Sequence, residues 1–194
     1  MNSKNKNVMQ SLEMLTINEE PKGKEDLMEL LWEAIEYFPE GIWGDIRYLG
    51  NIDLGHDVMI KLKTKFYKAF VFESIMRRIA GMKKLLKSEA LLLALMRDPV
   101  IAIYPKFERG KFRRVVSLVH DYVSKDVGIV SLFKLEEETA VKVAAHGLGH
   151  SQGLRHHQEP IDLMYARLLN GNLMRDGFCD GCQRELRMRS KLEE

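Results

Sequence analysis

Histidines gather in one short stretch of this chain, and their spacing lets several of them reach one point. Four of the six histidines, His146, His150, His156 and His157, lie within twelve residues. His146 and His150 are four residues apart in a segment of helical periodicity, so both imidazoles leave the same face about one turn apart. Gly153 permits a sharp left-handed turn, after which the chain can fold back and bring in His156. Three neutral imidazoles with a fourth position open are typical of a catalytic zinc site.

These histidines could instead be ordinary surface or core residues at a helix end, and two glycines argue against that alternative. Gly147 and Gly149 lie inside the predicted helix, where each costs about 1 kcal/mol relative to alanine. Linked binding of zinc contributes roughly 10 kcal/mol or more, which outweighs this loss. We therefore expect zinc-dependent order in residues 139–156.

The composition describes an ordinary globular chain. Of its 194 residues, 45% are hydrophobic and 30% charged, which suits one soluble domain with a real core. The sequence has no apolar run long enough for a transmembrane helix and no apolar stretch behind the lysines of its N-terminus, so we expect a cytoplasmic protein. In such a chain the single C-x-x-C, Cys179 and Cys182, indicates metal or redox chemistry before a structural disulfide.

The elements that position these residues can be predicted from periodicity. Helical spacing covers 25–38, 70–95 (as one or two helices) and 136–150. Strand patterns lie near 45–65, 99–104, 114–119 and 128–133. We expect an α/β fold in which a small twisted mixed sheet packs on helices. Residues 1–24 are interpreted as a flexible leader, and 25–194 as a single domain with a sheet and helix part (25–135) and a zinc-binding part (136–194).

The histidine stretch resembles the metzincin clan of zinc peptidases, whose pattern is H-E-x-x-H-x-x-G-x-x-H followed by a methionine turn. It matches from His146 to His156, and Met164 falls at the methionine turn. More narrowly, residues 136–186 are similar to the archaemetzincins, small intracellular proteins that close with F-C-x-x-C, here beginning at Phe178. Upstream, the resemblance rests only on the order of strands and helices. It implies a metzincin-like fold, zinc on the three histidines and a peptide or protein as substrate or ligand.

Archaemetzincins hold a second, structural zinc with four cysteines, and the resemblance implies a related site here. Cys179 and Cys182 match two of those cysteines, whereas His157 and Asp162 occupy the positions of the other two. Because both replacements can themselves bind zinc, the pattern favours a mixed second site. Aspartate is a harder ligand, however, and two cysteines can also oxidise or stay free thiols, so that alternative remains open.

Gly147 departs from the family pattern at the glutamate that takes a proton from water and passes it to the leaving amine. A positioned general base contributes about 10² to 10⁴ in rate, so hydrolysis should be weakened or lost. Glu159 and the run Glu136, Glu137 and Glu138 could replace it, but we interpret each as a solvated surface acid.

Two other classes of function compete with a peptidase. The first is a catalytically inactive, zinc-stabilised module that binds a peptide or protein. The second is a nucleic-acid binder, suggested by lysines, arginines and aromatic residues between Lys61 and Lys87. The net charge of only +2 and the lack of a matching motif argue against nucleic acid. His56 and His120, beside Asp57 and Asp121, are interpreted as hydrogen-bonded structural histidines and receive no functional role.

Overall fold

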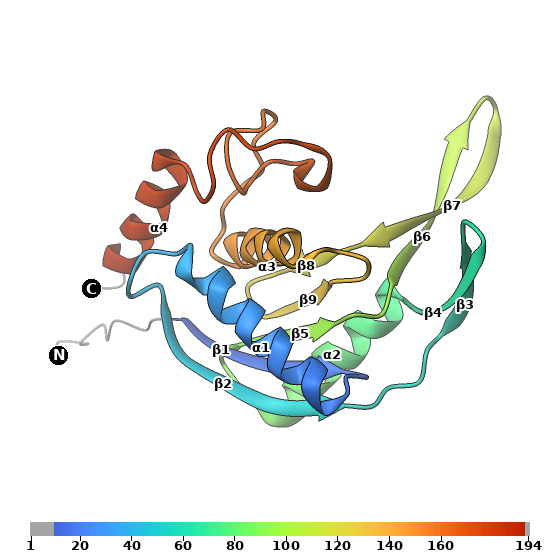
Figure 1. The fold of residues 1–194 in the computed structure, drawn as a ribbon, viewed down its shortest axis with the longest axis horizontal. Coiled ribbons are helices and arrows are strands. Elements are labelled where there is room, and N and C mark those ends of the chain that lie inside the picture. The colour runs from blue at the N-terminus through green and yellow to red at the C-terminus, as the bar shows by residue number, and fades with distance from the viewer. Residues whose placement is uncertain (1–9, 193–194) are drawn as a thin grey trace, which may run out of the picture.

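Strands and helices alternate along residues 10–192, which are the residues that the computed structural model describes (Figure 1). The helices are α1 (Pro21–Glu36), α2 (Phe72–Leu86), α3 (Glu137–Ser151) and α4 (Asp180–Leu192), with a 3-10 turn at Leu168–Asn170. The strands are β1 (Gln10–Ile17), β2 (Trp43–Ile52), β3 (Val58–Leu62), β4 (Lys65–Val71), β5 (Leu91–Met96), β6 (Val100–Glu108), β7 (Lys111–Val119), β8 (Asp121–Val123) and β9 (Val127–Ser131). This is the α/β class that the sequence predicts. No helix among these residues is both long enough and apolar enough to cross a membrane.

Five strands form a central sheet in the order β2-β1-β5-β9-β8, parallel throughout except for β8, which pairs antiparallel with β9 at one edge. In Figure 1, α1 and α3 cover one face of this sheet and α2 covers the other. Alternate residues of β5 serve the two faces. Leu91, Leu93 and Leu95 join the core under α1 and α3, and Leu92, Ala94 and Met96 join the core against α2.

The remaining strands form a second sheet in the order β3-β4-β6-β7. Only β4 and β6 are parallel in it, and the β3–β4 and β6–β7 hairpins extend away from the helices (Figure 1). The sequence predicts one small sheet rather than two. A hydrophobic pattern shows which segments are strands but does not specify which of them pair, and the prediction was incomplete for that reason.

The prediction of a flexible leader over residues 1–24 was wrong for the part that the structure describes. β1 lies in the middle of the central sheet, between β2 and β5, and α1 already begins at Pro21. Leu12, Met14 and Ile17 are fully buried, and the buried carboxylate of Glu13 pairs with Arg47. This polar neighbour on β2 lets an acidic residue lie inside the sheet. Residues 1–9 lie outside the described residues.

The prediction of helical structure over 70–95 was correct only for its first part. α2 ends at Leu86, and the apolar run that follows it is β5, buried along its whole length. Leucine, alanine and methionine are good helix formers, but a parallel strand covered on both faces also appears in sequence as a continuous apolar run. The two predicted parts of the domain also share one core, because α3 packs with α1 against the central sheet.

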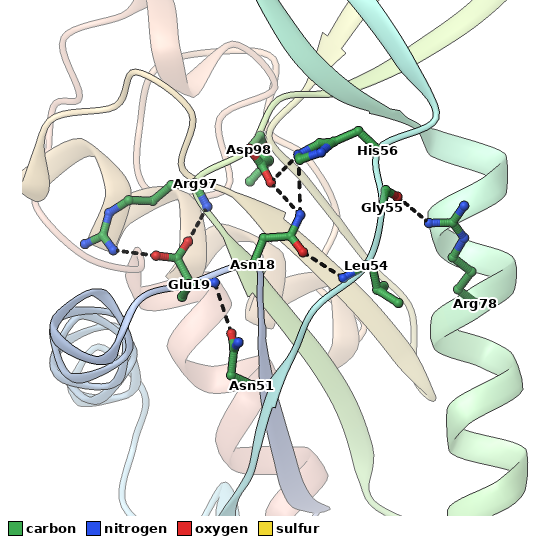
Figure 2. Close-up of polar contacts among 10 residues, drawn as sticks. Asn18, Glu19, Asn51, Leu54, Gly55, His56, Arg78, Arg97 and Asp98 are labelled. Carbon is green, nitrogen blue, oxygen red and sulfur yellow. Dashed lines mark hydrogen bonds and ion pairs between the residues drawn. The ribbon is translucent and has the colours of Figure 1, made fainter.

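A polar network joins the turns that follow β1, β2 and β5 (Figure 2). The side-chain amide of Asn18 donates to Asp98 Oδ2 at 2.9 Å, and its oxygen accepts from the backbone N–H of Leu54 at 2.7 Å. His56 Nε2 lies 2.8 Å from the same oxygen of Asp98. His56 is therefore a hydrogen-bonded structural histidine, as the sequence analysis expects, and the network fixes one end of the central sheet.

Candidate metal centre

The helix α3 carries the first two candidate ligands on one face. It starts with Glu137 and Glu138 in its first turn, where acidic side chains complement the helix dipole, and ends at Ser151. Most of its residues from Ala140 onwards are buried against the sheet and α1. Apolar packing therefore also stabilises this helix against its two glycines. Zinc-dependent order stays a prediction, chiefly for the segment at and beyond the end of the helix.

His146, His150 and His156, which we call the histidine cluster, converge as their spacing predicts. The Nε2 atom of His150 lies 3.0 Å from that of His146 and 2.8 Å from that of His156. The third distance, between His146 and His156, is 3.1 Å. Gly153, with φ +78°, makes the left-handed bend that returns the chain. His146 is buried, His150 is half-buried and His156 is exposed, so the cluster opens to solvent on one side.

Two backbone carbonyls fix which ring nitrogens in this cluster carry a proton. His146 Nδ1 lies 2.6 Å from Leu163 O, and His150 Nδ1 lies 3.0 Å from Leu154 O. A carbonyl oxygen only accepts, so each Nδ1 must donate, and in the neutral ring each Nε2 then presents a lone pair. Two lone pairs pointing at each other across 3.0 Å have no proton between them. A shared divalent cation satisfies this arrangement, so the donor set fits zinc.

Burial disfavours the charged form of both helix histidines. It lowers the pKa of His146, against the hydrogen bond to Leu163, which acts in the opposite direction. It also lowers the pKa of His150, and a charge on His146 would lower it further. Neutral imidazole is the form that binds metals, so the environment keeps these two side chains in the ligating state.

His157, Asp162, Cys179 and Cys182, which we call the mixed cluster, form a second convergent group. Their ligand atoms all lie within 4.8 Å of one another. His157 Nε2 is 3.3 Å from the Cys182 sulfur, 3.7 Å from the Cys179 sulfur and 3.5 Å from Asp162 Oδ2. The side chains come from the segment after α3 and from the start of α4, and together they offer two sulfurs, one nitrogen and one oxygen. Such a set fits zinc.

Asp162 organises the mixed cluster from its centre. Its side chain is fully buried, and its two oxygens accept hydrogen bonds of 2.8 Å from the backbone N–H groups of Met164 and Cys179. Burial alone would raise the pKa of this carboxyl, but these hydrogen bonds hold the pKa below its usual value. The pKa of the Cys182 thiol is raised, first by burial and then by the charge of Asp162. A cation among these groups would favour the charged forms of both side chains, and so would offset the effects of burial and of Asp162 on the Cys182 thiol.

Consecutive residues connect the two clusters. Asp162 belongs to the mixed cluster, Leu163 O accepts from His146 of the histidine cluster, and Met164 packs beneath α3. Met164 is fully buried, and its sulfur would lie only 2.7 Å from a Cβ placed on Gly149. Any larger residue at 149 would therefore have to displace Met164, which lies under the histidine helix. Its role as a methionine turn stays a prediction.

The space beside Gly147 contains a carboxylate that sequence reasoning missed. A Cβ placed on Gly147 would lie 3.5 Å from Asp121 Oδ2 and 2.8 Å from a methyl group of Val123, both on β8. Burial raises the pKa of the Asp121 carboxyl, and charges on His150, His156 and His120 would lower it. No local pattern in the sequence predicts this placement, because it depends on the packing of a three-residue edge strand against α3.

The acids that the sequence analysis considered as substitutes for the missing glutamate lie in exposed positions. Glu136, Glu137 and Glu138 are exposed at the beginning of α3, and Glu138 pairs with Lys142 at 2.6 Å. Glu159 is also exposed, in the segment between His157 and Asp162. The interpretation of these residues as solvated surface acids agrees with these positions.

The fold is that of archaemetzincins. The chain matches the archaemetzincin of Methanopyrus kandleri with a TM-score of 0.61 and 18% identity, covering 98% of each chain. It also matches a zinc-dependent peptidase of Methanocorpusculum labreanum with a TM-score of 0.57 and 14% identity, covering 90% of this chain and 99% of that one. No protein-family model and no curated protein sequence matches the chain. The similarity thus lies in the arrangement of the backbone far more than in the sequence.

Proposed function

We propose that this protein is a zinc-binding, metallopeptidase-like protein that hydrolyses peptide bonds slowly. The observation that carries the proposal is the convergence of three Nε2 atoms within 2.8–3.1 Å of one another, two of them held by backbone carbonyls. Zinc bound there would polarise a peptide carbonyl and make a water molecule more acidic. The exposure of His156 leaves a side of the cluster through which a substrate can approach.

The chain's own residues would hold and orient the substrate. β8 is the edge strand of the central sheet, pairs only with β9 among the described strands, and packs on α3. An extended peptide can add to such an edge through main-chain hydrogen bonds, which would place one of its peptide bonds near the histidine cluster. Met164 gives the cluster an apolar floor, and the mixed cluster would hold a second, structural zinc that anchors the segment after α3.

Metal analysis of the purified full-length chain tests the proposal directly. We expect two equivalents of zinc in the wild type and one in His150→Ala. The matched control is His56→Ala, which removes a histidine outside both clusters and should retain two equivalents. Less than one equivalent in the wild type would contradict the proposal.

Hydrolysis is measured on the same samples with a library of quenched fluorescent peptides. We expect slow cleavage that a chelator abolishes, that added zinc restores and that His150→Ala lacks. Two equivalents of zinc with no cleavage would support the competing function, a zinc-stabilised module that binds peptides or proteins without cutting them. The absence of the usual glutamate at Gly147 is the observation that favours that second candidate.

A further inference from the structure

The absence of a side chain at Gly147 leaves room that a residue of the neighbouring strand occupies. We propose that Asp121, on β8, supplies the carboxylate that serves as general base and proton carrier at the histidine cluster. The inference rests on the proposed function, because it assigns a residue to that reaction. It assigns the base to a different element of the fold, because the carboxylate would reach the site from the sheet edge, whereas the usual glutamate would be on α3.

The distances place the Asp121 carboxylate within the reach of a glutamate side chain at position 147. Asp121 Oδ2 lies 3.5 Å from the position of a Cβ on residue 147, and the Cβ of Asp121 lies 3.4 Å from the same point. In a glutamate side chain the carboxylate oxygens are separated from their own Cβ by about this distance. Asp121 therefore occupies the volume that such a side chain would sweep.

The carboxylate is also free to act. Asp121 is half-buried, and among the described residues its side chain has no hydrogen-bond or ion-pair partner. A carboxylate removed from water without a partner is costly unless something else uses it. The histidines that affect it electrostatically are His150 and His156 of the cluster and its neighbour His120.

Its position favours the role of a base over that of a metal ligand. The ligand atoms of the histidine cluster all lie within 4.8 Å of one another, and the Asp121 carboxylate is not a member of that group. A general base does not bind the metal itself but lies within hydrogen-bond reach of the attacking water. Asp121 is close enough to His150 and His156 for their charges to act on it, yet it lies outside the set of ligands, as such a base would.

Glycine at 147 and aspartate at 121 depend on each other. The Cβ of any larger residue at 147 would lie 2.8 Å from a methyl group of Val123, closer than real Cβ contacts. β8 can approach α3 this closely only because Gly147 has no side chain, and that approach is what brings Asp121 to the site. The same glycine that removes the usual base therefore admits another.

In the proposed hydrolysis, Asp121 moves one proton from water to the leaving amine. The Asp121 carboxylate takes one proton from the attacking water while the water oxygen forms a bond to the carbonyl carbon of the peptide. Asp121 then gives this proton to the amide nitrogen as the carbon–nitrogen bond breaks, which leaves an amine and a carboxylic acid that ionises. Asp121 ends the cycle ionised as it began, and no oxidant or reductant is needed.

The test compares Asp121→Asn with the wild type, both loaded with zinc. We expect kcat to fall by about 10²-fold or more while KM stays nearly constant, because an amide of the same shape cannot accept the proton. Zinc content should remain at two equivalents. The control, Glu159→Gln, converts an exposed acid to its amide and should leave kcat unchanged.

A second readout does not depend on turnover. A peptidyl hydroxamate binds zinc through two oxygens and transfers its hydroxyl proton to a neighbouring base. Calorimetric titration should therefore show binding about 10- to 100-fold weaker in Asp121→Asn, as expected for loss of a hydrogen bond to a charged group. Equal hydroxamate affinity in the two proteins would overturn the inference, as would a kcat within a few-fold of the wild type.

The remaining outcomes separate the two proposals. Loss of one zinc equivalent in Asp121→Asn would make Asp121 a ligand and overturn its role as base, while zinc-dependent hydrolysis by the wild type would still support the proposed function. Failure of the wild type to bind zinc would contradict the proposed function itself.

A rescue variant tests whether Asp121 and a glutamate at position 147 can serve the same site. Asp121→Asn combined with Val123→Ala and Gly147→Glu returns the carboxylate to α3 and removes the methyl groups that would collide with it. Recovery of kcat above the Asp121→Asn value supports the inference. A folded, zinc-loaded rescue variant with no recovery would count against the equivalence of the two positions.

Discussion

The histidine cluster and the mixed cluster lie close together in the chain but are supported in different ways. Two ligands of the histidine cluster stand on one packed helix, and its third, His156, is exposed. In the mixed cluster, Asp162 and Cys182 are buried and the other two side chains are half-buried. Three of its ligands come from the segment between α3 and α4, which has little regular structure, and Cys182 lies in the first turn of α4. The histidine cluster is therefore suited to admit a ligand from solvent, whereas the mixed cluster is suited to stabilise the segment between α3 and α4.

The largest effect should come from removing metal with a chelator. Structural zinc contributes about 10 kcal/mol or more to small metal-dependent folds, and the mixed cluster joins both ends of the segment 157–179. Hydrogen exchange should accelerate at the amides of Met164 and Cys179, which Asp162 holds, while the interior of α3 keeps its protection. Uniform acceleration over the whole chain would contradict the difference between the clusters.

Substituting one ligand in each cluster should separate structure from function. Cys182→Ala leaves three buried or half-buried groups without their shared cation, so we expect one zinc equivalent to be lost and the free energy of unfolding to fall by about 3 kcal/mol or more. His156→Ala should also lose one equivalent but cost less stability, because its side chain is exposed. Urea denaturation with zinc analysis measures both. Equal losses of stability would remove the distinction.

Gly149→Ala tests the packing of Met164 under the histidine helix. The new Cβ would lie 2.7 Å from the Met164 sulfur and 3.3 Å from the ring of Phe178, and overpacking of this kind costs about 1–3 kcal/mol. Alanine returns about 1 kcal/mol of helix propensity, so a net loss of about 1 kcal/mol is expected. The control is Gly81→Ala in α2, where nothing lies within 4 Å and stability should rise. Urea denaturation of both variants gives the comparison, and a stabilised Gly149→Ala would refute the close contact.

The smallest effect should come from Lys142→Gln, which removes one ion pair within α3 and one between α3 and the segment before α4. Lys142 lies 2.6 Å from Glu138 and 3.4 Å from Asp176. Such pairs contribute about 0.5 kcal/mol, so a much larger loss in a pH-dependent denaturation series would show that ion pairs, and not metal, hold that segment.

The stability that the ion pairs of Lys142 contribute should fall at alkaline pH. The hydrogen bond to Glu138, opposed by partial burial, raises the pKa of Lys142 above its ordinary value of 10.5. Its contribution is therefore fully present at neutral pH and is lost as the pH rises through the raised pKa. Lys142→Gln should lack this alkaline component.

The sequence was most informative where function depends on local spacing. His146 and His150 are placed by the repeat of one helix and His156 by a glycine bend, so their convergence could be predicted without knowing the rest of the fold. The mixed cluster required more, because Asp162 and Cys182 are separated by a segment without clear periodicity. Only the resemblance to a family pattern suggested that they meet.

Positions set by distant parts of the chain could not be predicted. β1 contains a glutamate at its centre and shows its buried character only once Arg47 and both neighbouring strands are present. β5 has the composition of a helix, and its pairing with β1 and β9 makes it a strand. Asp121 reaches the site through the packing of β8 on α3, which no local pattern of its own sequence reveals.

The hydrogen bond between His146 and Leu163 O has a consequence for how the protein matures. Leu163 follows Asp162 directly, so a newly made chain can present this carbonyl to the helix only after the segment around Asp162 has closed. The segment that carries Asp162 and the ring of His146 would then become ordered together, because a carbonyl beside one ligand of the mixed cluster orients one ligand of the histidine cluster.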